Sequence, residues 1–124
     1  MRKIGIMSLG ELVPEPSVTG PAAEAAAGLA THAMDVANFL KALGHDGRLM
    51  ILCHLQSGEK SVSELEALLS SRQAAVSQQL ARLRLEGLVS AERAGQAIFY
   101  SIRDQRVADI LRFLAGVWCR DTEK

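Results

Sequence analysis

The sequence has 124 residues, with 14 acidic and 14 basic side chains and only 4% aromatic residues. This length fits one domain with one core, and the zero formal charge argues against a strongly basic nucleic-acid binder. Few aromatics beside many Ala and Leu favour a mainly helical chain. The charge is nevertheless uneven: residues 46–71 hold four acidic and two basic side chains, whereas residues 72–103 hold five basic and two acidic ones. A local positive patch of this kind is sufficient for salt-sensitive phosphate contact.

The first 20 residues are expected to form a tail, because Pro14, Pro16 and Gly20 interrupt any regular pattern. Residues 21–124 are expected to form a single DNA-binding and dimerisation domain. Its first element is predicted to be a long helix over Ala22–Leu43, since Pro21 suits a first helical turn. No run approaches the roughly 18 apolar residues of a membrane span, and no secretory leader is recognised. We therefore expect a cytoplasmic protein without membrane contact, whose two cysteines are reduced.

Three further helices are predicted in the centre of the chain. The first, Gly47–Gln56, is expected to be capped by Asp46, and it is apolar nearly all round, as in the middle of a domain. The next two, Val62–Leu69 and Gln73–Glu86, are separated by a tight break. Gly87 is expected to end the last of them with a positive φ.

The helix Gln73–Glu86 combines an apolar stripe with an unusual outward face. Val76, Leu80 and Leu83 recur at helical spacing and predict the buried side. The outward positions carry glutamine, serine and arginine, which can bond base edges and phosphates. Together with the residue before the helix and two residues beside the following turn, the predicted DNA-binding residues are Arg72, Gln73, Ser77, Gln78, Gln79, Arg82, Arg93 and Gln96.

After Gly87 the hydrophobic period changes. Leu88–Arg93 and Gln96–Arg103 predict a β-hairpin around Ala94-Gly95, with the glycine at positive φ. Asp104 is expected to cap a last helix with a long apolar stripe. This order predicts a mainly α winged helix-turn-helix with a two-stranded β-hairpin wing and N- and C-terminal dimerisation helices. The outer helices carry more apolar surface than one small domain covers, so we expect a homodimer that reads an inverted repeat of double-stranded DNA.

Several segments resemble the ArsR/SmtB repressors of bacteria. These are ALGHDGRLMILCHL, VSELEALL, AAVSQQLARLRLEGLV and GQAIFYSI, and the similarity runs from about Asn38 to Leu114. The resemblance implies a dimeric winged-helix repressor whose inducer weakens DNA binding. It also identifies two metal sites of the family that are broken here. Ser61 and Ser63 replace the cysteines of a C-V-C motif, and Arg106 replaces the histidine of a D-x-H motif, so no metal ligand set is expected.

The remaining chemistry lies in Cys53, on the central helix, and Cys119, near the end of the last helix. This arrangement resembles the sulfide-responsive SqrR/BigR branch of the family. The resemblance implies that reactive sulfur species join the two cysteines and relieve repression of sulfide-response genes. Two thiols held slightly too far apart for a disulfide would favour a longer polysulfide link, which we state as a hypothesis about selectivity.

Three alternatives remain open. The cysteine pair is also compatible with a general-oxidant sensor or a thiophilic-metal sensor, although two thiolates are few for arsenite. A helical protein-interaction module without DNA activity is disfavoured by the outward glutamines. A cysteine on an apolar helix is also a common core residue, which is the structural alternative for Cys53. No nucleophile–base pair or phosphate-binding loop is recognised, so neither enzyme activity nor a cofactor is expected.

Overall fold

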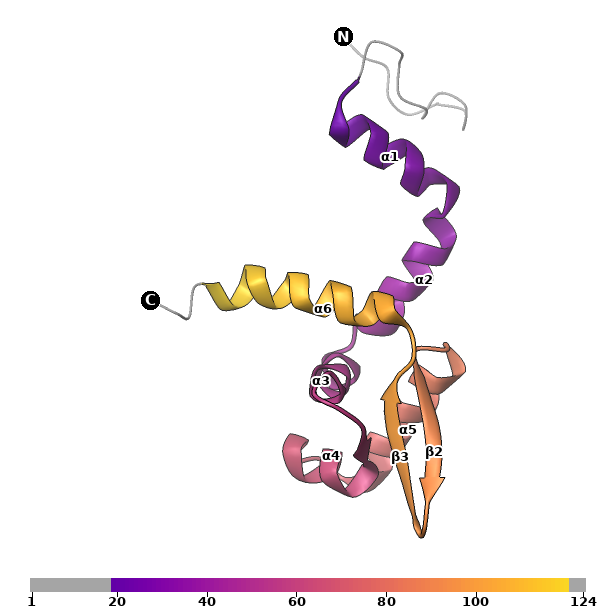
Figure 1. The fold of residues 1–124 in the computed structure, drawn as a ribbon, viewed down its shortest axis with the longest axis vertical. Helices are drawn as coiled ribbons and strands as arrows, with labels where there is room; N and C mark the ends of the chain where they lie inside the picture. Colours follow the sequence, from indigo (N-terminus) through magenta and orange to yellow (C-terminus); the bar gives the residue numbers. More distant parts are fainter. Residues whose placement is uncertain (1–18, 121–124) are drawn as a thin grey trace. The chain divides into compact units, whose positions relative to one another are not determined.

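The computed structural model describes residues 19–120. The chain divides into two compact units, residues 1–38 and residues 39–124, and each is described by itself (Figure 1). Nearly all of the predicted tail, residues 1–20, lies outside the described residues. Within the described range, no helix combines the length and hydropathy that a membrane crossing requires.

The first unit contains α1 (Pro21–Thr31) and the start of α2 (Ala33–Leu43). The prediction of one continuous helix over Ala22–Leu43 is therefore wrong. The interruption falls at His32, whose φ of −114° and ψ of 18° leave the helical region. The sequence supports continuity poorly at this point, because Gly28 and the Thr31-His32 pair have low helix propensity. No residue of α1 is buried, so packing does not compensate for that weakness.

The second unit begins with the last turn of α2 and has the predicted element order. Its mainly helical architecture with a small antiparallel sheet confirms the winged helix-turn-helix prediction. The remaining elements are α3 (Asp46–Leu55), β1 (Lys60–Ser61), α4 (Val62–Leu69), α5 (Gln73–Leu85), β2 (Val89–Ala94), β3 (Ala97–Ile102) and α6 (Gln105–Trp118).

The sheet has three strands in the order β1-β3-β2, so β1 adds one strand to the predicted two-stranded wing of β2 and β3. In the added pairing, Lys60 lies opposite Tyr100 and Ser61 lies opposite Phe99. A strand of two residues is too short to show a period in the sequence, and only its pairing with β3 defines it. The β2–β3 hairpin is confirmed, and Gly95 at its turn has a φ of 67°.

One core holds the helices and the sheet of the second unit together. Leu52, Leu65, Leu80, Leu83 and Val107 have no exposed surface at all, and they come from α3, α4, α5 and α6. Figure 1 shows α5 beside the β2–β3 hairpin and α4 below α3. This packing fixes the angular position of α5, because its three buried residues must face the core.

The local ends of the helices follow from specific side chains. Ser61 and Glu64 form a capping box at α4, with the Ser61 hydroxyl accepting from the Glu64 N–H at 3.2 Å and the Glu64 carboxylate accepting from the Ser61 N–H at 2.8 Å. Gly87 ends α5 with a φ of 79°, as predicted. The predicted cap of α3 is corrected: His45 is the N-cap and Asp46 is already helical, although both side chains accept from the Gly47 N–H.

Candidate nucleic-acid interface and cysteine pair

The outward face of α5 carries most of the predicted DNA-binding side chains. Arg72 precedes the first helical turn with extended backbone, and its side chain makes no capping bond. The described structure leaves five predicted residues of this region exposed, namely Arg72, Gln73, Ser77, Gln78 and Arg82. The exposure follows from the helical period, because Val76, Leu80 and Leu83 turn the opposite side of α5 into the core. These side chains can donate to phosphates and exchange hydrogen bonds with base edges.

Arg82 already has an intramolecular partner. Its Nε donates to a carboxylate oxygen of Glu86 at 3.2 Å, and 52% of the arginine side chain remains exposed. An exposed pair at this helical spacing contributes at most about 0.5 kcal/mol. The guanidinium can therefore leave Glu86 for a phosphate at little cost.

Gln79 differs from its neighbours on α5. It is half-buried, and its amide oxygen accepts a hydrogen bond from Nη1 of Arg48 at 3.2 Å. Sequence reasoning did not single out Arg48. The available signal is an arginine directly before the largely apolar run Leu49–Leu55, because a charge that packs beside such a run needs partners.

The wing supplies the other two predicted residues. Arg93 lies opposite Ile98 in the hairpin, and Gln96 lies in the turn beside Gly95. Both side chains are exposed. The β2 strand of the wing packs against α5, so the hairpin and the helix form one connected body.

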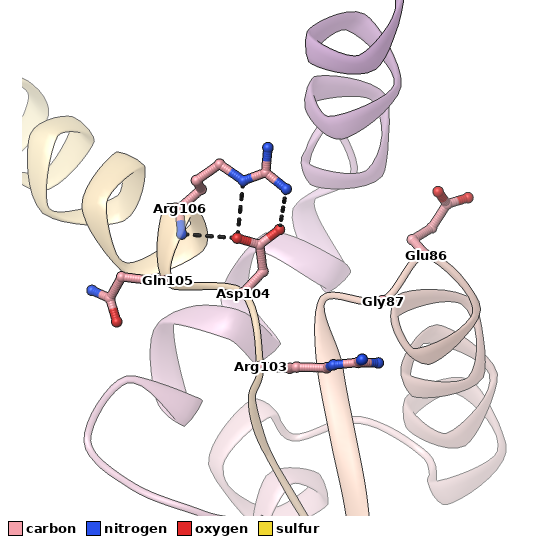
Figure 2. Close-up of a pocket in the computed structure, with 6 residues that line it drawn as sticks. All are labelled: Glu86, Gly87, Arg103, Asp104, Gln105 and Arg106. Carbon is pink, nitrogen blue, oxygen red and sulfur yellow. Dashed lines mark hydrogen bonds and ion pairs between the residues drawn. The ribbon is translucent and has the colours of Figure 1, made fainter.

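An open cleft of about 430 Å³ lies where α5, β3 and α6 meet. Figure 2 shows Arg106 folded over Asp104, and Glu86 and Arg103 on the other side of the opening. The Arg106 guanidinium donates to both carboxylate oxygens of Asp104, at 3.0 and 2.8 Å. These hydrogen bonds hold the pKa of Asp104 below its usual value, and the same carboxylate caps α6 through the Arg106 N–H, as predicted.

Ser61 and Asp104 lie at the two positions where the resemblance places metal-binding motifs, and both side chains have other roles in this structure. Ser61 caps α4, and both oxygens of Asp104 are engaged by Arg106. Among residues 19–120, no three His, Cys, Asp or Glu side chains are grouped so that they could hold a metal ion.

The two cysteines lie on different helices of the second unit. Cys53 is half-buried in α3, and Cys119 is exposed at the C-cap of α6. Burial raises the pKa of the Cys53 thiol, and the negative charge of an ionised Cys119 raises it further. The two thiols are therefore close enough to interact electrostatically, and the raised pKa leaves less of Cys53 as thiolate at neutral pH than of an ordinary cysteine. The Gln56 amide also donates to the Ala108 carbonyl at 3.3 Å, which ties α3 to α6.

Comparison with known proteins assigns the central part of the chain to a family. Residues 45–91 match the model described as "Bacterial regulatory protein, arsR family". A biofilm growth-associated repressor of Agrobacterium fabrum is 43% identical over 91 residues, which cover 73% of this chain and 78% of that protein.

Two solved structures share the fold. The transcriptional repressor BigR from Xylella fastidiosa has a TM-score of 0.71 and 40% identity, covering 73% of this chain and 93% of that one. Reduced HlyU from Vibrio cholerae has a TM-score of 0.69 and 35% identity, covering 73% and 96%. The relatives and the fold are those of DNA-binding transcriptional regulators and not of enzymes, which confirms that prediction.

Proposed function

The chain belongs to the ArsR family of bacterial regulatory proteins, and from that premise we propose that it is a dimeric transcriptional repressor that senses reactive sulfur species. It binds an operator through α5 and the wing. Cross-linking of Cys53 and Cys119 releases the operator and derepresses sulfide-response genes. The observation that supports the sensing part is the presence of two free thiols that interact electrostatically, one half-buried on α3 and one exposed at the end of α6.

The exposed polar face of α5 supports the DNA-binding part of the proposal. Arg72, Gln73, Ser77, Gln78 and Arg82 are accessible on one helix, and Arg93 and Gln96 are accessible on the wing that packs against it. A helix of this kind enters the major groove, while arginines beside it contact phosphates. The full operator is then an inverted repeat, because dimers are typical of the family and a two-fold dimer presents two equivalent helices.

The exposed apolar face of α6 supports the dimer. Phe113 is 65% exposed and Trp118 is 73% exposed, although both are large aromatic side chains. Val117 adds to the same helix with 39% of its surface exposed. A second copy that covers α6 would bury this surface, as expected for a homodimer.

The proposed chemistry begins at Cys119, because its thiol is the exposed one. Its thiolate attacks a sulfane sulfur of a persulfide or polysulfide donor, which forms a sulfur chain on Cys119 and releases the donor's thiol. The Cys53 thiolate then attacks the sulfur next to the end of that chain. The second sulfur–sulfur bond forms, the terminal sulfur leaves as hydrosulfide, and both cysteines are oxidised at the expense of the donor.

DNA binding is tested by a matched pair of arginine variants. We expect Arg82→Gln to weaken binding of the full chain to its own upstream region and to reduce the slope of log affinity against log salt by about 2, because each of the two subunits loses one phosphate contact. Arg112→Gln is the control, since Arg112 is exposed on α6 and pairs with Asp109 at 2.6 Å. Equal effects of the two substitutions in a mobility-shift titration would contradict the assignment of α5.

Sensing is tested with Cys53→Ser, Cys119→Ser and the double variant. Each is expected to bind DNA like the unmodified protein and to retain it after treatment with glutathione persulfide. Parallel treatment with hydrogen peroxide, zinc and arsenite separates the general-oxidant and metal alternatives, which predict release by those agents. If the double variant still lost DNA on persulfide treatment, the sensing model would fail.

A further inference from the structure

Arg48 connects three helices of the second unit through a single guanidinium. Its Nε donates to the Ala42 carbonyl at 2.7 Å, and its Nη2 donates to the Lys41 carbonyl at 3.2 Å. Its Nη1 donates to Oε1 of Gln79 on α5 at 3.2 Å. The side chain is part-buried at two of these three bonds, so water competes for it less than at the surface.

The bonds to α2 have a clear physical reason. Lys41 and Ala42 belong to the last turn of α2, where carbonyl groups lack the usual i+4 helical donor and carry the negative end of the helix dipole, although the Lys41 carbonyl also accepts from the Gly44 N–H at 3.2 Å. A planar guanidinium can satisfy two such carbonyls and still present a third donor in a fixed direction. The last turn of α2 therefore orients Arg48 toward α5.

Gln79 is held on the other side of this connection. It is half-buried beside Gly47, where an added Cβ would lie 3.9 Å from Cγ of Gln79. It also lines a recess of about 180 Å³ together with Ala75 and Val76. Gln78, the preceding residue, is exposed. Two adjacent glutamines on α5 thus have different surroundings, one facing solvent and one facing Arg48.

From this geometry we infer that Arg48 is a positioning residue for DNA binding and that Gln79 orients α5 instead of reading a base. The inference rests on the proposed function, because it assigns the way in which the reading helix is held. Arg48 fixes α5 relative to the last turn of α2 by way of the Gln79 amide oxygen. Loss of either partner lets α5 shift, which weakens every base contact of the helix together.

The test is a double-mutant cycle on DNA affinity in the full chain. The probe is a duplex selected from a random library by the unmodified protein. We expect Arg48→Ala and Gln79→Ala each to lower affinity about tenfold, and the double variant to bind no more weakly than the weaker single variant. Additive losses would overturn the assignment, because independent roles give no coupling.

Base preference separates positioning from reading. Gln79→Ala is expected to lower affinity without flattening the preference at any one base pair, whereas Gln78→Ala, the matched control, relaxes the preference at one position. Gln79→Glu keeps an acceptor for Arg48 but removes both amide donors. We expect the DNA dissociation constant of this variant to lie within about threefold of that of the unmodified protein. A base-reading role, which needs the amide donors, does not predict this rescue. Loss of preference at one base pair in Gln79→Ala, or failure of the Glu rescue, would overturn the inference.

The experiment distinguishes a folding defect, failure of the proposed function and failure of the positioning role. If Arg48→Ala unfolds in a thermal melt, the Gln79 variants decide the question alone. If the unmodified protein selects no duplex at all, the proposed function is overturned. Selection of a duplex whose binding is unaffected by Gln79→Ala would overturn only the positioning role.

Discussion

The helices α5 and α6 differ in what they expose. The outward positions of α5 are mainly glutamine, serine, alanine and arginine, and the one large exposed apolar residue is Leu85 at its end. On α6, Phe113, Val117 and Trp118 are exposed although Val107 and Leu111 of the same helix are buried. Each helix buries one side in the same core, but the outer side of α5 is polar and the outer side of α6 is apolar.

This difference indicates two kinds of partner. A polar face with arginines retains its hydration when free and can exchange it for phosphates and base edges, as a reading helix must. An exposed aromatic face is costly in water and is relieved by another protein surface. One cysteine belongs to each of these regions. Cys119 lies at the end of α6, and Cys53 lies in α3, which packs against α5.

The largest expected effect breaks the buried side of α5. Leu80 has no exposed surface, so Leu80→Ala should lower the free energy of unfolding by about 3 kcal/mol. Leu85→Ala on the same helix is the matched control, since 82% of Leu85 is exposed and its loss should change stability by no more than about 0.5 kcal/mol. Urea denaturation measures both, and similar losses would contradict the assigned faces of α5.

A smaller effect tests the outer side of α6. We expect Phe113→Ala to raise the dimer dissociation constant about 30-fold, because truncation of a buried aromatic anchor costs about 2 kcal/mol of association. The exposed Arg112 next to it serves as the control through Arg112→Ala. Sedimentation equilibrium gives the dissociation constants. An unchanged dimer in the Phe113 variant would place the subunit interface elsewhere.

The smallest effect concerns the start of α6. The lowered pKa of Asp104 means that its ionised form stabilises the fold, a contribution present above the ordinary pKa of about 3.9 and lost as the pH falls through the lower folded-state value. Asp104→Asn keeps a capping oxygen but removes the charge facing Arg106, so it should cost less than about 1 kcal/mol at pH 7. Urea titrations at several pH values should show this difference shrinking in acid. A constant difference would contradict the ionic origin.

Much of the second unit could be predicted because local signals and packing agree. The α5 stripe, the glycine at position 87 and the hairpin turn at Gly95 each have a short-range cause, and the structure reproduces all three. Similarity to the ArsR family could also be seen in the sequence. Such agreement is expected where propensity and pattern favour the same structure.

The errors and omissions have non-local causes, except for the break at His32, whose cause is local. Strand β1 exists only because Lys60 and Ser61 pair with β3, residues some 40 positions later in the chain. The role of Arg48 depends on carbonyls of α2 and on Gln79, which only the tertiary fold brings together. The break at His32 is a weak local preference that no burial in α1 opposes. The helical period alone predicts an exposed Gln79, whereas its contact with Arg48 leaves the side chain half-buried.

The central claim is that chemistry at Cys53 and Cys119 controls binding at α5. The most direct measurement titrates the protein–DNA complex with glutathione persulfide and follows, in the same samples, DNA release by anisotropy and the Cys53/Cys119 peptides by mass spectrometry. We predict that an intramolecular cross-link between the two peptides rises in proportion to DNA release and that Cys119→Ser shows neither. DNA release without that cross-link would contradict the account.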